Sequence, residues 1–271
     1  MPTAATWDPR QYLRHSGHRA RPFHDLLARI PDPVARPGGP RVVDLGCGPG
    51  NVTALLAARW PTAHVTGLDS SPEMLAEAAA HAGPTPGGGR LDFTRADLTD
   101  WAPAEPFDLI VSSATLQWVP GHAGSFPAWT AALTPGGSLA FTLPGNFQAP
   151  SHTLLRDLCG SERWRDRLGG LYDTRHILEP AGYLDRLTGL GLTVDAWETT
   201  YSHLLTGPDP VLDWTKGTAL RPVLTALSGD PGAVEEFLGA YGAMLREAYP
   251  AGPHGTVFPF RRIFVVGRRP G

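Results

Sequence analysis

Short apolar runs alternate with helix-compatible segments along the first half of the chain. Apolar runs cover residues 41–45, 64–69, 107–113 and 138–143, and apolar side chains recur at helical spacing between them. The run 107–113 is apolar almost throughout, which is typical of a parallel strand covered on both faces. This alternation predicts an α/β fold, with a doubly wound, mostly parallel sheet, right-handed crossovers and helices on both faces.

The first apolar run leads directly into a glycine-rich turn. Asp44 is followed by Gly46, Gly48 and Gly50, and a helix-compatible segment begins at about Asn51. Glycines let the chain turn sharply and let a ligand approach the backbone. The spacing differs from the dinucleotide fingerprint, and Asp44 would repel a pyrophosphate. The turn therefore suits a cationic ligand, and S-adenosylmethionine, with its sulfonium and ammonium groups, is such a ligand.

Two further acids follow at the ends of later strands. Asp69 ends the run 64–69 about twenty residues after the turn, where an acid can accept hydrogen bonds from both ribose hydroxyls. Asp97 follows the third predicted strand and can reach an adenine amino group. Because the carboxyl ends of parallel strands meet at one edge of a sheet, we expect both acids to lie near Asp44, beside the first and fourth strands.

The glycine turn, Asp69 and the segment 96–98 together resemble the motifs of class I S-adenosylmethionine-dependent methyltransferases. This resemblance implies a Rossmann-like sheet of seven strands whose last strand runs antiparallel to the others. It implies S-adenosylmethionine as the cofactor, and Cys47 is then a small residue of the turn and no nucleophile. The cofactor-binding residues that we expect are Asp44, Gly46, Cys47, Gly48, Gly50, Asp69, Ser70, Met74, Asp97, Leu98 and Ser113.

The chain is expected to combine core segments with helical insertions. The expected segments are an N-terminal arm and helix closing the site at 1–40, the cofactor-binding core at 41–143, a cap insertion at 144–175, a core helix and strand at 176–202, a helical cap insertion at 203–259, and the final strand and tail at 260–271. Both insertions adjoin strand ends at the cofactor edge, so we expect them to cap the site. The alternative is that they form a dimer surface or cover a sheet edge.

Residues outside the shared core carry a narrower resemblance. The segments 7–22, 116–120, 144–147, 197–201 and 258–264 are similar to those of the trans-aconitate 2-methyltransferase family. This resemblance implies transfer of a methyl group from S-adenosylmethionine to one carboxylate of trans-aconitate, giving the monomethyl ester and S-adenosylhomocysteine. It leaves open which acid is preferred and which carboxylate is esterified.

A carboxylate acceptor places few chemical demands on the protein. It is ionised at neutral pH, so no catalytic base is required, and arginines can bind it through paired hydrogen bonds. We prefer Arg262 to Arg261 for this role, because the alternating neighbours of Arg262, at 260, 264 and 266, are apolar. The substrate-binding residues that we expect are Tyr12, Arg19, Arg21, Trp118, Tyr201, His203 and Arg262.

Composition excludes several other classes of protein. A net charge of -3 over 271 residues argues against a nucleic-acid-binding protein, which would normally be basic. The two cysteines have no metal-ligand spacing around them, so we expect neither a disulfide scaffold nor a metal site. No apolar targeting segment or membrane-spanning run is present, so we expect a cytoplasmic protein that acts on a small molecule, as a monomer.

Two alternatives remain open from the sequence alone. A related methyltransferase could act on another acid, a hydroxyl or an amine, and a protonated acceptor would need a base, for which His203 is the candidate. A noncatalytic S-adenosylmethionine-binding module would be expected to have lost the glycine turn or Asp69, and both are intact. An RNA-modifying enzyme is disfavoured, because the basic residues are scattered among acids.

Overall fold

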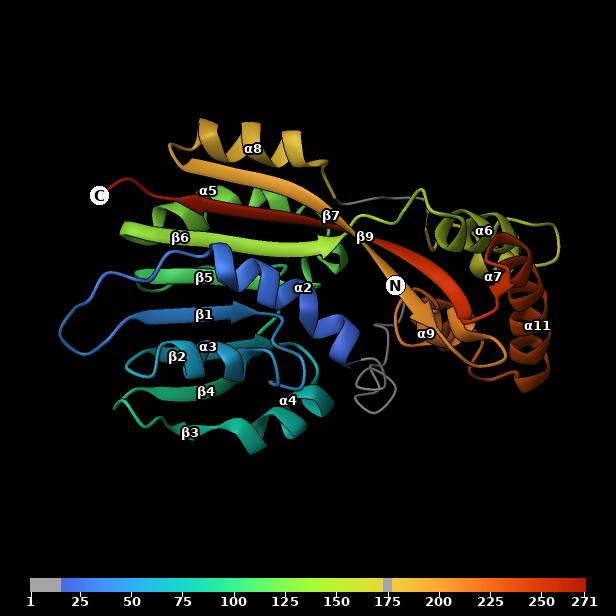
Figure 1. Ribbon diagram of the computed structural model, residues 1–271, viewed down its shortest axis with the longest axis horizontal. Helices are drawn as coiled ribbons and strands as arrows, with labels where there is room; N and C mark the ends of the chain where they lie inside the picture. Colours follow the sequence, from blue (N-terminus) through green and yellow to red (C-terminus); the bar gives the residue numbers. More distant parts are fainter. Residues whose placement is uncertain (1–15, 173–176) are drawn as a thin grey trace. The chain divides into compact units, whose positions relative to one another are not determined.

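The computed structural model describes residues 16–172 and 177–271, and the chain divides into two compact units (Figure 1). The described part of the first, which we call the core unit, spans 17–143, 177–198 and 262–271. The described part of the second, which we call the insertion unit, spans 144–172 and 199–261 together with Ser16. No helix in these described ranges is long and apolar enough to cross a membrane.

Within the described residues, one sheet of nine strands organises the chain. In order across the sheet the strands are β3 (Gly83–Pro84), β4 (Arg90–Arg95), β2 (His64–Asp69), β1 (Arg41–Leu45), β5 (Phe107–Ser113), β6 (Leu133–Pro144), β9 (Gly255–Arg268) and β7 (Thr193–Leu205), and β8 (Ala251–Gly252) pairs with β9. β1 pairs in parallel with both β2 and β5, β2 with β4, and β5 with β6. The strand order therefore reverses direction at β1 and β5, which is the switch point of a doubly wound fold.

The last long strand, β9, runs against β6. The Arg269 N–H donates to the Gly137 carbonyl and the Gly145 N–H donates to the Arg261 carbonyl, each at 2.9 Å. Residue numbers on β9 therefore fall as those on β6 rise, so the two strands are antiparallel. The prediction of a mostly parallel sheet with an antiparallel last strand is confirmed. The strands β3 and β8, of two residues each, lie beyond the seven that we expected.

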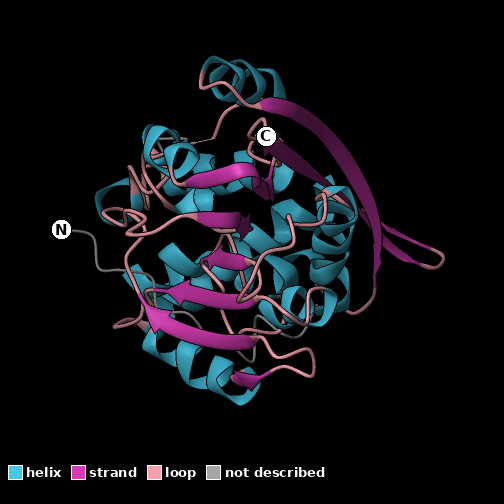
Figure 2. Cartoon of the chain, turned by 90° about the vertical axis from the view of Figure 1, so that its left-hand side faces the viewer, coloured by secondary structure: helices cyan, strands magenta, loops and turns pink. Residues whose placement is uncertain are grey.

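Helices cover both faces of the sheet in the core unit. They are α2 (Ser16–Arg29), α3 (Thr53–Arg59), α4 (Pro72–Ala78), α5 (Phe126–Ala131) and α8 (Pro180–Gly189), with the 3₁₀ turns η1 (Ala79–His81), η2 (Leu116–Trp118) and η3 (His122–Gly124). Figure 1 shows α2 and α3 in front of the strands and α5 behind them, and Figure 2 shows helices on both sides of the strands. This arrangement buries both faces of β1 and β5, as their apolar sequences require.

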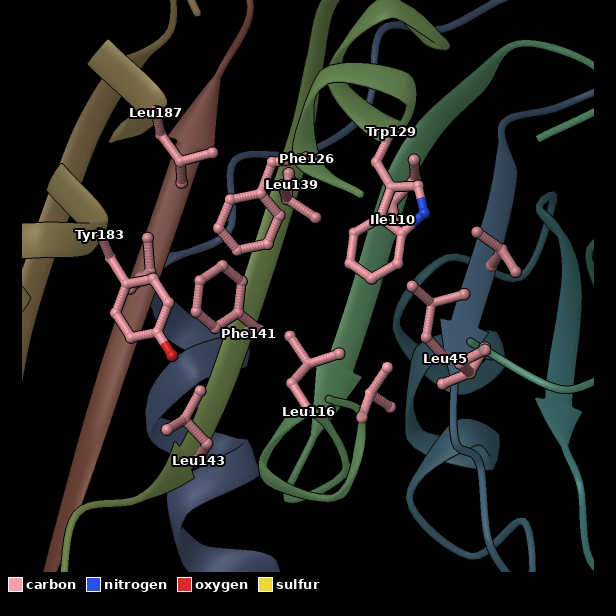
Figure 3. Close-up of a cluster of buried hydrophobic side chains, with 14 of the residues drawn as sticks. Leu45, Ile110, Leu116, Phe126, Trp129, Leu139, Phe141, Leu143, Tyr183 and Leu187 are labelled. Atoms are coloured by element: carbon pink, nitrogen blue, oxygen red, sulfur yellow. The ribbon is translucent and has the colours of Figure 1, made fainter. Parts of the chain in front are cut away.

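Aromatic packing fixes α5 and α8 against β6. The Phe141 ring of β6 lies 5.0 Å from the Tyr183 ring of α8 and 5.6 Å from the Phe126 ring of α5. Tyr183 and Leu187 stand four residues apart, so both point from α8 into this cluster (Figure 3). Each such side chain contributes about 1.5–3 kcal/mol by its burial. The cluster thereby holds the strands whose ends form the candidate site.

The insertion unit has its own hydrophobic core. Its helices are α6 (Pro150–Cys159), α7 (Arg165–Leu168), α9 (Pro210–Lys216), α10 (Arg221–Ala226) and α11 (Pro231–Ala248). Phe237, Tyr241 and Leu245 form one buried stripe along α11, at the spacing of an amphipathic helix. The Tyr241 hydroxyl donates to the Ser151 carbonyl at the start of α6, which ties the two helices together.

Two strands are longer than we predicted. We expected β7 to end at Tyr201 and β9 to begin at Phe260, but they continue to Leu205 and start at Gly255. Buried and exposed residues go on alternating through both extensions, because one face of each stays packed on the insertion-unit core. Tyr201 therefore lies within a strand and does not end it.

Helix α2 begins earlier than we predicted. Proline favours the first turn of a helix, so the sequence predicts a helix that begins at about Pro22. The helix instead begins at Ser16, and Pro22 lies inside it. The free amide groups of a helix N-terminus lie in its first turn, and Arg21 is therefore beyond them. A helix start at Pro22 would have placed Arg21 beside those free amides, where the helix dipole also favours an anion, and this expectation is wrong. The proline and glycine content of the segment 83–89 predicts a loop, but the segment begins with the short strand β3.

Candidate functional site

The glycine turn after β1 folds back onto β2. The N–H groups of Gly46 and Cys47 both donate to the Leu68 carbonyl, at 2.7 and 2.9 Å. Gly46, Gly48 and Gly50 have φ angles of +78°, +55° and +79°, in the region that favours glycine. The turn is thus a defined backbone structure at the carboxyl end of the first strand.

The three glycines are needed for different reasons. A Cβ atom on Gly46 would lie 2.1 Å from Cγ2 of Thr115, and one on Gly50 would lie 2.8 Å from Cζ of Phe93. Close packing therefore excludes a side chain at both positions. A Cβ atom on Gly48 would have no heavy atom of the described residues within 4 Å. The backbone at Gly48 is consequently open to a ligand.

Asp69 links this turn to helix α4. Its Oδ2 accepts a hydrogen bond from the Gly48 N–H and its Oδ1 accepts one from the Ser71 N–H, each at 2.9 Å. A carboxylate has about four acceptor positions, so Asp69 retains capacity for ligand hydroxyls. Ser71 then caps α4 by accepting from the Met74 N–H at 3.3 Å, whereas Ser70 is exposed beside it.

Asp44 is the most deeply buried acid of the turn. Its side chain is 1% exposed, and its Oδ2 accepts a hydrogen bond from the Thr53 hydroxyl at 2.7 Å. Its Oδ1 has no hydrogen-bond partner within the described ranges. Burial raises the pKa of Asp44 to about 7, the Thr53 hydrogen bond opposes this rise, and the charge of Asp69 adds to it. A cation beside Asp44 would favour its ionised form.

The end of β5 is fastened to the end of β1. The Ser112 hydroxyl donates to the Leu45 carbonyl at 2.7 Å, and the Thr115 hydroxyl donates to the Gly46 carbonyl at 3.1 Å. Between them Ala114 adopts a φ of +55°, which is uncommon for a residue with a side chain. The expected site residue Ser113 lies in this segment, half-buried at the end of β5.

The remaining expected cofactor residues differ in exposure. Asp97 is exposed, and hydrogen bonds from the Thr99 N–H and hydroxyl, at 2.9 and 2.8 Å, lower its pKa. Met74 and Leu98 are buried. Cys47 is 5% exposed, and burial raises the pKa of its thiol, followed by the charges of the neighbouring acids. This thiol is therefore protonated at neutral pH, in keeping with a packing role.

Three expected substrate-binding residues lie in the core unit with their side chains described. Trp118 is exposed at the end of η2, and Arg21 is exposed on α2. Arg262 is 6% exposed on β9 and shares the buried face of that strand with Phe258 and Phe260. The backbone of Arg19 lies in α2. Tyr12 lies outside the described residues.

The other two, Tyr201 and His203, lie in the insertion unit. Both are buried, and the His203 ring stacks on Trp214 with the centroids 4.9 Å apart. The Tyr201 and His203 rings are nearly parallel, with their centroids 6.2 Å apart, and Phe260 lies at the same distance from His203. These four rings form one aromatic cluster. That Tyr201 and His203 share a cavity with Arg262 stays a prediction.

Sequence reasoning missed several residues that shape the turn. Thr53 holds Asp44, Thr115 holds Gly46, and Ser71, next to the expected cofactor residue Ser70, caps α4. A threonine in the first turn of the helix that follows a buried acid is a usable signal for the first contact. Within the described residues, no group of three or more His, Cys, Asp or Glu side chains could hold a metal ion.

Comparison with known proteins gives both a fold and a family. A family model described as a methyltransferase domain matches residues 42–137. The phosphoethanolamine N-methyltransferase 2 of Haemonchus contortus has a TM-score of 0.56 with 16% identity, covering 97% of this chain and 57% of that one. The [4+2]-cyclase SpnF has a TM-score of 0.53 with 19% identity, covering 100% of this chain and 89% of that one. A methyltransferase and a cyclase thus share this fold, so the fold alone does not identify a reaction.

Two relatives are similar over almost their whole length. The trans-aconitate 2-methyltransferase of Streptomyces coelicolor is 64% identical over 271 residues, covering 99% of this chain and 88% of that protein. The protein of the same name from Mycobacterium tuberculosis is 45% identical over 268 residues, covering 96% and 95%. Because the similarity includes both insertions as well as the common core, the chain belongs to the trans-aconitate 2-methyltransferase family of class I methyltransferases.

Proposed function

We propose that this protein transfers a methyl group from S-adenosylmethionine to one carboxylate of trans-aconitate. The products are the monomethyl ester and S-adenosylhomocysteine. The observation that supports this proposal is the 64% identity to a trans-aconitate 2-methyltransferase over 99% of the chain. That identity extends well beyond the residues 42–137 that match the general methyltransferase domain.

The cofactor would bind at the glycine turn. Asp44 would face its cationic end, the backbone at Gly48 would contact it, Asp69 would accept from the ribose hydroxyls, and Asp97 from the adenine amino group. The unpartnered buried oxygen of Asp44 and the open space at Gly48 support this placement. When bound, S-adenosylmethionine supplies an electrophilic methyl carbon. We propose that the surrounding wall includes Gly46, Cys47, Gly50, Ser70, Met74, Leu98 and Ser113.

The protein's task toward the acid would be placement. A carboxylate needs no base, so the side chains must align it and exclude water. Arg262 suits this role because it is 6% exposed, and a guanidinium shielded from solvent binds a carboxylate strongly. We propose that Arg19 and Arg21 bind the other carboxylates. Tyr12, Trp118, Tyr201 and His203 complete the proposed set as walls or neutral donors.

The expected segments keep their proposed roles. We propose that 1–40 closes the site and that the insertions 144–175 and 203–259 cap it. The core segments 41–143, 176–202 and 260–271 would carry the cofactor. Sheet topology supports this division, because the segment 144–175 begins where β6 ends and the segment 203–259 begins in the last residues of β7. A monomeric, cytoplasmic enzyme stays a prediction, and the net charge of -3 argues against nucleic acid as a partner.

A methyl-transfer assay with labelled S-adenosylmethionine tests the proposal. The panel is trans-aconitate, cis-aconitate, citrate, isocitrate and malonate, with wild type, Asp69→Ala and the control Asp92→Ala. Asp92 is half-buried on β4 and pairs with Arg90, away from the turn. We expect selective labelling of trans-aconitate by wild type and the control, and its loss in Asp69→Ala. Tight binding of S-adenosylhomocysteine without transfer to any acid would overturn the proposed acceptor.

A further inference from the structure

Three buried acceptor oxygens surround the glycine turn without a partner. Among the described residues, Oδ1 of Asp44, Oδ1 of Asn51 and Oε1 of Gln117 are buried and accept no hydrogen bond. Asp44 precedes the turn and Asn51 follows it. Gln117 lies two residues after Thr115, whose hydroxyl contacts Gly46. A buried acceptor left unpaired costs about 1–3 kcal/mol, so three around one turn indicate a ligand that donates hydrogen bonds.

The orientation of the Gln117 amide is fixed by its neighbour. The Nε2 group donates to the Ala114 carbonyl at 2.6 Å. Rotating the amide would place Oε1 against that carbonyl, and two acceptors repel each other. Ala114 has a φ of +55°, a conformation that costs about 1–3 kcal/mol and persists where its surroundings enforce it. Because the amide closes this strained turn, Oε1 is left facing away from Ala114.

The ligand chemistry follows from what each molecule can donate. At neutral pH trans-aconitate is ionised and offers no N–H or O–H to an acceptor oxygen. S-adenosylmethionine offers ribose hydroxyls, an adenine amino group and an ammonium group with three N–H donors. The first two are matched by Asp69 and Asp97 at the ends of β2 and β4. The ammonium group is left for the acceptors beside β1 and β5.

We propose that Gln117 is a cofactor-binding residue whose Oε1 accepts a hydrogen bond from the ammonium group of S-adenosylmethionine, together with Asp44 Oδ1 and Asn51 Oδ1. The inference rests on the proposed function, since it takes that cofactor as the ligand. Asp44 supplies the opposite charge, and Gln117 supplies direction without a second charge. Trp118 follows Gln117 in the same 3₁₀ turn, so cofactor binding also fixes the backbone from which this proposed substrate wall projects.

Calorimetry with two ligands tests the inference. Gln117→Met preserves the length of the side chain but removes the acceptor, and the exposed Gln148 provides the matched control Gln148→Met. The ligands are S-adenosylhomocysteine and its analogue in which hydrogen replaces the amino group. We expect Gln117→Met to weaken S-adenosylhomocysteine binding about 10- to 100-fold, the value of a hydrogen bond to a charged group, and to change binding of the analogue less than about threefold.

The other outcomes are distinguishable. An equal loss for both ligands, or no loss for S-adenosylhomocysteine, overturns the role of Gln117 while leaving the proposed function intact. Failure of wild type to bind S-adenosylhomocysteine overturns the proposed function and this inference with it. If Gln117→Met lacks a cooperative thermal transition, Gln117→Glu replaces it, since a carboxylate keeps the acceptor. In Gln117→Glu the ratio of the affinity for S-adenosylhomocysteine to the affinity for the analogue must then equal or exceed the wild-type ratio. A lower ratio overturns the inference.

Discussion

The hydroxyl of Thr53 donates a hydrogen bond to Asp44 Oδ2 across 2.7 Å, and both side chains are buried. Asp44 lies in β1 and Thr53 begins α3, so this contact closes the chain on both sides of the glycine turn. It satisfies one carboxylate oxygen and leaves the other for a ligand. The turn is therefore held in shape by a residue that we do not expect to touch the cofactor.

Replacing Thr53 by valine should destabilise the protein. The substitution removes the hydroxyl at nearly constant volume and leaves Asp44 without its protein donor. We expect the free energy of unfolding to fall by about 1–3 kcal/mol, measured by urea denaturation at pH 8. Thr188→Val on the exposed surface of α8 is the matched control, and should change it by no more than about 0.5 kcal/mol. Equal effects of the two variants would contradict the role given to the Thr53 contact.

The pH dependence of stability should carry the signature of Asp44. Burial raises its pKa from 3.8 to about 7. Between these values the unfolded chain has lost this proton and the folded chain retains it, so stability falls as pH rises, and the effect levels off above pH 7. The loss of unfolding free energy over this pH range is about 4 kcal/mol at most. We expect the difference in unfolding free energy between wild type and Asp44→Asn to decrease from pH 5 to pH 7, and a constant difference would refute the assignment.

Cofactor affinity should also depend on the ionisation of Asp44, but it should rise with pH whereas stability falls. The ionised carboxylate of Asp44 attracts an ammonium group, so binding of S-adenosylhomocysteine should tighten as pH rises through about 7. Calorimetry at several pH values measures this, with Asp44→Asn as the comparison. The variant should bind more weakly and lose most of the pH dependence. An unchanged pH profile in Asp44→Asn would mean that another group controls binding.

Local chemistry made the cofactor edge predictable from the sequence. Glycines at alternate positions and acids at the ends of apolar runs are patterns that neighbouring residues determine, and the strand order places those acids at one sheet edge. The contacts that hold the turn were not predictable. Thr115 contacts Gly46, which is 69 positions away in the sequence. A single threonine forms no sequence pattern from which such a distant partner could be predicted.

Element bounds failed where tertiary packing decided them. Polar residues at 198–203 end the apolar pattern of β7, yet the strand continues because alternate side chains pack into the insertion-unit core. Pro22 suggested a helix start because proline favours the first turn, but α2 contains it in its interior. In the β7 region the local pattern was outweighed by contacts with the insertion-unit core.

The glycine positions of the turn should respond differently to alanine. Gly48→Ala and Gly38→Ala introduce strain at φ angles of +55° and +82°, and neither new Cβ would meet an atom within 4 Å. Each should cost about 1 kcal/mol of stability. Only Gly48→Ala should weaken S-adenosylhomocysteine binding, by at least about 10-fold, because its Cβ enters the space left for the ligand. Thermal unfolding and calorimetry measure both effects, and equal ligand affinity in the two variants would rule out contact at Gly48.

Arg262 gives the sharpest test of the proposed acid site. Arg262→Lys keeps the charge but replaces a planar guanidinium with a point charge, so paired hydrogen bonds to a carboxylate are lost. We expect the KM for trans-aconitate to rise about 10- to 100-fold, because hydrogen bonds to a charged group are lost, while the affinity for S-adenosylhomocysteine is unchanged.

The matched controls for this test are Arg268→Lys at the exposed end of β9 and Arg261→Lys beside the site residue. Steady-state kinetics of the three variants decide between the two neighbouring arginines. Arg268→Lys should behave as wild type. Because Arg262 shares the buried face of β9 with Phe258 and Phe260, we expect only its variant to lose affinity for the acid. A rise in KM confined to Arg261→Lys would transfer the role to Arg261 and show that strand alternation does not select the arginine.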